Sequence, residues 1–104
     1  MAWFILIMAG LFEIGFTTSM RYTAGFTKPL PTAVFLVFAG LSFYLLTKAA
    51  ETIPLGTSYA VWTGIGAAGT VIIGIFYFGE PASALRLAFL VTLIGSIIGL
   101  KLVS

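Results

Sequence analysis

Glu13 is the residue whose type and position most clearly indicate chemistry. It lies near the middle of an apolar segment, in the stretch LFEIGFTTSM that covers residues 11–20. A charged side chain at the centre of a membrane-spanning helix costs roughly 2.5–3.5 kcal/mol on insertion scales, so such residues usually have a function. No Lys or Arg stands deep inside an apolar segment. The counter-charge of Glu13 must therefore be a proton or a cation from outside the chain. The alternative is a protonated Glu13 that only hydrogen bonds to another helix.

The residues that share a helical face with Glu13 predict a pocket around it. Residues three and four positions away on a helix lie on the same face. Here they include Gly10, Phe16 and Thr17. A small residue on one side, with an aromatic ring and a hydroxyl on the other, favours a pocket lining over a lipid-facing surface.

A second group of candidate residues lies in TSYAVWTGIGAAGT, residues 57–70. The Tyr59 and Trp62 rings are three positions apart and can line a cation site, since a desolvated ammonium over an aromatic face gains ~2 kcal/mol. The Tyr59 hydroxyl can also donate to a carboxylate. An aromatic belt at the membrane interface is the alternative. The same face carries further small and hydroxyl residues, namely Thr63, Gly66, Gly69 and Thr70.

Two further features of the apolar segments leave alternatives open. The hydroxyl of Ser42 can orient Glu13 or can bond to the backbone of its own helix. The glycines between residues 64 and 74 can let their helix bend during a transport cycle or can allow neighbouring helices to approach closely.

Composition identifies the class of protein. Of the 104 residues, 61% are hydrophobic and only 8% are charged, whereas a soluble domain has about 25% charged residues. The chain has no His and no Cys, which excludes imidazole bases, thiolate nucleophiles, disulfides and Cys/His metal sites. Its five basic residues are scattered, so no nucleic-acid partner is expected. We expect neither an enzyme nor a cofactor or metal site.

The predicted fold is an all-α membrane protein with four transmembrane helices in one domain covering residues 1–104. The expected spans are about 2–20, 32–50, 55–78 and 85–103, each near the 20 residues that a bilayer requires. With four spans, Lys48 and Lys101 lie on one side of the membrane, and Arg21, Lys28 and Arg86 on the other. This charge distribution gives almost no orientation preference. It allows an antiparallel, dual-topology dimer in which two copies form the inverted pair found in many transporters.

The last segment is the candidate dimer interface. It contains GSIIG, in which Gly95 and Gly99 are four residues apart. Small residues at this spacing let membrane helices pack closely. A dimer would hold two Glu13 carboxylates that bind protons or a cation in competition. The sequence has no nucleotide-binding motif, which favours the proton gradient as the energy source.

Across essentially its whole length the chain resembles the small multidrug resistance family. The similarity lies in the Glu13 segment, the following GFTKPLP, the run IPLGTSYAVWTGIGA at residues 53–67, and the closing GSIIGLK. It implies an antiparallel dimer, usually a homodimer, in a bacterial inner membrane, with proton-coupled export of toxic cations. It also implies that Glu13 is the essential carboxylate and that Tyr59, Trp62 and Ser42 belong to the binding site.

Within that family the sequence resembles two branches. YAVWTGIGA and IGLK are similar to guanidinium exporters, whereas Thr17, Thr18 and Met20 are similar to the branch that exports quaternary ammonium ions. Guanidinium exporters usually have Trp followed by Ala where this chain has Phe16 and Thr17. We therefore expect guanidinium or guanidinyl compounds together with some hydrophobic quaternary ammonium ions as substrates.

Two other functions remain as alternatives. A proton-conducting membrane subunit would also carry a single intramembrane carboxylate. A non-transporting or heteromeric partner subunit would have the same four spans, although paired subunits are expected to show opposite and definite charge biases, which this chain lacks.

Overall fold

Four helices account for most of the computed structural model, which describes residues 1–103. They are α1 (Ala2–Met20), α2 (Pro29–Ala49), α3 (Leu55–Tyr77) and α4 (Ala84–Val103). The described residues include no strand. Each helix is long and apolar enough to cross a membrane. The prediction of an all-α fold with four membrane-spanning helices is confirmed.

The start of α2 differs by three residues from the expected one. The helix begins at Pro29 rather than near Thr32, and Pro31 also lies in its first turn. The first N–H groups of a helix have no partner inside the helix, so proline is tolerated there and its fixed φ suits the helix. The prolines that were expected to precede the helix therefore form its first turn.

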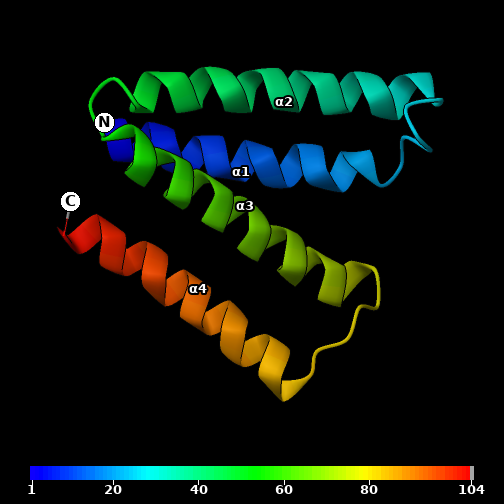
Figure 1. Cartoon of the computed structure of the whole chain (residues 1–104). Helices are drawn as coiled ribbons and strands as arrows, with labels where there is room; N and C mark the ends of the chain where they lie inside the picture. The colour runs from blue at the N-terminus through cyan, green and yellow to red at the C-terminus, as the bar shows by residue number, and fades with distance from the viewer. Residues whose placement is uncertain (104) are drawn as a thin grey trace.

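The helices are arranged as a flat layer, measuring 41 × 35 × 17 Å. In the described chain, α1 packs against α2 and α3, whereas the α4 backbone comes close only to α3. One side chain of α4, Lys101, also reaches α1, with its Nζ atom 5.5 Å from the centroid of the Trp3 ring. Figure 1 shows α4 at the outer edge of this layer, with the two chain ends at the same end of the molecule. The helix pair α1–α3 therefore occupies the middle of the layer, where neighbouring helices support it on both sides.

Large apolar side chains cover the outside of the helices, while small residues fill the contacts between them. Phe76, Tyr77 and Leu102 are about four-fifths exposed, and α4 has no buried residue. In lipid such exposure carries no hydrophobic penalty, and close packing between helices stabilises the fold instead.

Glycines mark the closest helix contacts. A Cβ atom at Gly10 of α1 would lie 2.7 Å from Cβ of Ile65 in α3, and one at Gly64 would lie 2.7 Å from Cδ1 of Ile97 in α4. Added Cβ atoms would also overlap neighbouring side chains at Gly66, Gly69 and Gly74. Of the two roles that the sequence left open, the structure therefore supports close packing at these positions.

Candidate functional site

The Glu13 side chain lies in an open groove between α1 and α3. Glu13 is only 8% exposed, and the groove has a volume of about 370 Å³. Except for the carboxyl group and three hydroxyls, the lining is apolar or glycine. The lining residues are Glu13, Thr17, Thr63, Gly66, Ala67, Thr70 and Val71. This composition provides one ionisable group in an otherwise weakly polar surface.

The carboxyl group of Glu13 packs directly on the backbone of α3. A Cβ atom at Gly66 would overlap the carboxyl group, so only glycine leaves room for it in this position. Among residues 1–103, no group forms a hydrogen bond or ion pair with the Glu13 carboxyl. A buried acid without a fixed partner is free to bind a proton or an external cation.

Ser42 and Trp62 form a polar connection one helical turn away from Glu13. The Ser42 hydroxyl donates to the carbonyl oxygen of Ala9 at 2.7 Å and accepts a hydrogen bond of 2.8 Å from Nε1 of Trp62. Ser42 is fully buried. Its donor proton thus goes to α1 rather than to Glu13 or to its own helix. This connection links α1, α2 and α3 through side-chain hydrogen bonds.

We expect Ser42→Ala to destabilise the protein. It would leave the buried Trp62 N–H without an acceptor, at a cost of about 1–2 kcal/mol. Thermal unfolding in detergent measures the loss. Ser96→Ala is the matched control, because the Ser96 hydroxyl is exposed and bonds only to Thr92 in its own helix. Equal melting temperatures for the two variants would contradict a structural role for the connection.

The other candidate residues of α1 and α3 have different surroundings. Tyr59 is 57% exposed, and its ring centroid lies 5.8 Å from that of Trp62. Phe16 packs edge-on against Phe35 of α2, with centroids 5.6 Å apart. Gly10 contacts Ile65, as described above. Thr17 lines the groove, whereas Phe16 and Gly10 contact other helices and are not among the lining residues given above.

The Gly95 and Gly99 face of α4 lies away from the groove and is uncovered in the single chain. A Cβ atom at either glycine would meet no atom within 4 Å. Among residues 1–103, no atom packs where these Cβ atoms would lie, so this face is available to another surface.

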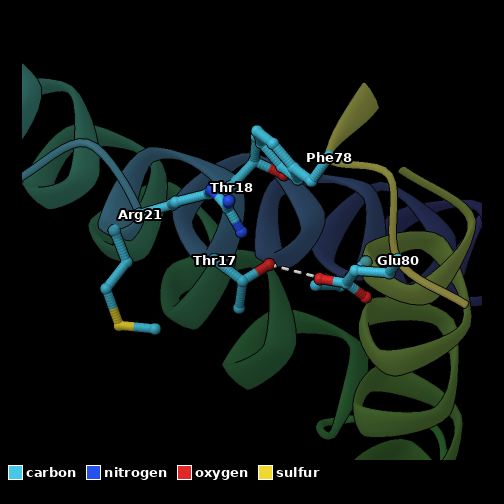
Figure 2. A pocket seen from close by; sticks show the side chains of 7 residues that line it. Thr17, Thr18, Arg21, Phe78 and Glu80 are labelled. Carbon is cyan, nitrogen blue, oxygen red and sulfur yellow. Dashed lines mark hydrogen bonds between the residues drawn. The ribbon is translucent and has the colours of Figure 1, made fainter. Parts of the chain in front are cut away.

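A hydrogen bond between two threonine hydroxyls links α1 and α3. The sequence predicted the helical face of each threonine but not their contact. The Oγ1 atoms of Thr17 and Thr70 are 2.7 Å apart. The dashed line that leaves Thr17 in Figure 2 marks this bond. Thr17 follows Glu13 by one helical turn, and Thr70 follows Gly66 by one turn. This equal spacing was the sequence signal for the pair. Because Glu13 contacts Gly66, the residues one turn further along α1 and α3 also lie side by side.

The groove offers binding chemistry rather than bond-breaking chemistry. Its single carboxyl group can exchange a proton for a cation, and its threonine hydroxyls can accept or donate hydrogen bonds. In the described chain, no three acidic residues come together as a metal site would require. The arrangement suits a reversible cation site.

Comparisons with known proteins place the chain in one family. The family model described as Small Multidrug Resistance protein matches residues 1–94. The chain is 47% identical to a guanidinium exporter of Yersinia pseudotuberculosis serotype I (strain IP32953) over 104 residues, which cover all of both chains. It is 46% identical to a guanidinium exporter of Proteus vulgaris, again over all of both chains. It is 45% identical to one of Escherichia coli (strain K12), covering 98% of this chain and 97% of that one.

Proposed function

Because the chain belongs to the small multidrug resistance family, we propose that it exports small guanidinium-type cations in exchange for protons. It is a multi-pass protein of a bacterial inner membrane, with four spans. Similar proteins over the full length are named guanidinium exporters. The proposed exchange uses the existing proton gradient and needs no nucleotide.

The unpaired carboxyl group of Glu13 carries this proposal. It is nearly buried, faces the groove between α1 and α3, and has no partner within the described chain. Proton and cation compete for one anionic group, so binding of either displaces the other. That competition couples the outward movement of a cation to the inward movement of a proton.

We propose that the working unit is an antiparallel homodimer. The groove of one chain is open, and Tyr59 beside it is more than half exposed. A second copy would enclose the cation and bring a second Glu13. The uncovered Gly95–Gly99 face of α4 supports close contact between copies. In this proposal Tyr59 and Trp62 form the aromatic wall, and Ser42 keeps Trp62 in position.

The proposed substrates include hydrophobic quaternary ammonium ions as well as guanidinium compounds. A planar guanidinium group suits paired hydrogen bonds with a carboxylate. A tetraalkylammonium ion has no N–H donor and depends on apolar contacts. Ala67 and Val71 supply such contacts in the groove. Phe16 packs on α2 and adds no hydrogen-bond donor to the groove.

Transport by the purified protein in liposomes under a pH gradient tests the function. We expect guanidinium to move against an inward proton flux, with proton flux lost when the cation is omitted. A tetraalkylammonium ion, measured in parallel, should be exported more slowly. Proton and cation concentrations should act competitively on the initial rate.

Three outcomes would contradict the proposal. Proton flux without any cation would favour a proton-conducting subunit. No cation-driven flux from the purified chain alone would favour an accessory or heteromeric subunit. Equal export of neutral analogues such as urea would show that the carboxyl group does not select the substrate.

A further inference from the structure

A second cavity adjoins the Glu13 groove at the C-terminal ends of α1 and α3. Its volume is about 180 Å³, whereas one water molecule needs roughly 10–15 Å³ measured this way. It shares Thr17 and Thr70 with the groove. Its remaining lining residues are Thr18, Met20, Arg21, Phe78 and Glu80. A small cation fits in this cavity, and the shared threonines put it next to the Glu13 groove.

We propose that this outer cavity is a staging site for guanidinium-type cations on their way to or from Glu13, and that Arg21, which lines the cavity, covers the Phe78 ring in the empty protein. The proposal rests on the proposed function and adds a second binding position to it. Glu80 and Phe78 would contact the cation, and the Thr17–Thr70 hydrogen bond would separate the two positions.

The backbone holds Glu80 firmly at the cavity. The N–H group of Glu80 donates to the carbonyl oxygen of Gly74 at 3.0 Å, and Gly79 provides the left-handed residue at the turn, with φ of 66°. A Cβ atom at Gly74 would overlap the Glu80 carboxyl group. The glycine therefore makes room for a carboxylate at this end of α3.

One oxygen of the Glu80 carboxylate remains free for a ligand. Oε1 binds Nη2 of Arg86 at 3.0 Å. Within the described chain, Oε2 has no hydrogen-bond partner. A guanidinium ligand can donate to this oxygen, because its N–H groups match carboxylate oxygens well.

Arg21 already shows how a guanidinium group fits the cavity. Its Cζ atom lies 4.0 Å from the centroid of the Phe78 ring. Figure 2 shows the Arg21 side chain extending toward Phe78, with Thr17 and Glu80 lower in the view. Among residues 1–103, no acceptor or acid binds the Arg21 side chain. Because only the ring contact holds it, a substrate guanidinium can take its place on Phe78.

The Thr17–Thr70 bond can open without leaving either hydroxyl proton unpaired. Each threonine has one hydroxyl proton. Thr17 can donate to the carbonyl oxygen of Glu13 at 2.9 Å, and Thr70 to that of Gly66 at 2.7 Å. When both hydroxyls donate to carbonyl oxygens of their own helices, no proton is left for a hydrogen bond between the two oxygens. The two threonines can then move apart. The boundary between cavity and groove can therefore open as the helices shift.

Initial rates of guanidinium transport in liposomes test the proposal through changes of opposite sign. We expect Glu80→Gln to raise KM roughly tenfold, since it removes a charge-assisted hydrogen bond. Arg21→Gln should lower KM about threefold, because the competing cation–π contact is gone. The matched controls Glu51→Gln and Lys28→Gln remove the same kinds of charge elsewhere and should leave KM unchanged.

Arg86→Gln separates binding from a structural role of the ion pair. It breaks the pair but keeps the Glu80 carboxylate, so KM should fall or stay the same. If the pair were only structural, Arg86→Gln and Glu80→Gln would impair transport alike, and the proposal would be wrong. Unchanged KM in both Glu80→Gln and Arg21→Gln would also overturn it, while leaving the proposed exporter function intact.

A binding measurement tests the outer cavity even if transport fails. A calorimetric titration of Glu13→Gln protein with guanidinium should show weak residual binding. This binding should disappear in the double variant Glu13→Gln/Glu80→Gln. Identical titrations of these two variants would refute the staging site. If the wild-type protein did not transport guanidinium, the exporter function would be refuted. The two titrations would still decide whether the outer cavity binds guanidinium.

Discussion

Glu13→Gln protein should neither export guanidinium nor carry cation-coupled protons, yet it should remain folded. Gln is nearly isosteric with Glu, so the packing against Gly66 is kept while the negative charge is lost. The hydrogen bonds between the cation and the charged carboxylate contribute about 3 kcal/mol, so their loss weakens cation binding roughly a hundredfold. Transport in liposomes and titration with guanidinium measure both effects. Helix content and elution volume in detergent should match those of the wild type.

Glu51→Gln is the control for this experiment. Glu51 is exposed and pairs only with Lys48, at 3.9 Å, so its substitution should leave transport unchanged. Export retained by Glu13→Gln protein would show that another group binds the cation. Loss of folding in that variant would mean that the carboxyl group supports the structure instead.

Gly66→Ala should also weaken cation binding, although less than the loss of the carboxylate does. The added Cβ would overlap the Glu13 carboxyl group, which must then move out of its position between α1 and α3. Overpacking of this kind costs about 1–3 kcal/mol, so we expect cation affinity to fall roughly tenfold. Titration with guanidinium gives the change in affinity, and thermal unfolding reports the strain.

Gly56→Ala provides a matched control in the same helix. A Cβ atom at Gly56 would meet nothing within 4 Å, and alanine favours the helix over glycine by up to about 1 kcal/mol. That variant should bind guanidinium as the wild type does and should be at least as stable. If Gly66→Ala bound guanidinium equally well, the carboxyl group would not need its present position.

The sequence was sufficient to predict the helices because each is a long apolar segment bounded by turn residues. α1 has the expected bounds of residues 2 and 20. The start of α3 and the end of α4 also lie where they were expected, whereas the remaining helix ends differ by one to three residues. Glu13 was identifiable for a related reason, because a lone acid stands out in an apolar helix.

The partners of the site residues could not be predicted from periodicity. A helical face tells which residues point the same way, but it does not tell which helix lies opposite or at what height. Ser42 therefore bonds to Ala9 rather than to Glu13. Glu80 lies between two of the expected spans, and only the fold reveals that its carboxyl group reaches Gly74 and the cavity beside Thr17.

The edge position of α4 has a consequence for how this protein can change over evolutionary time. The α4 backbone comes close only to α3, and its Gly95–Gly99 face lies outside the groove formed by α1 and α3. Substitutions at distant sites without shared contacts usually have additive effects. Substitutions on the Gly95–Gly99 face should therefore leave the packing of Glu13 against Gly66 within one chain unchanged. In the proposed dimer both copies enclose the cation, so a substitution on this face that changed how the copies pack would change the cation site without touching its residues.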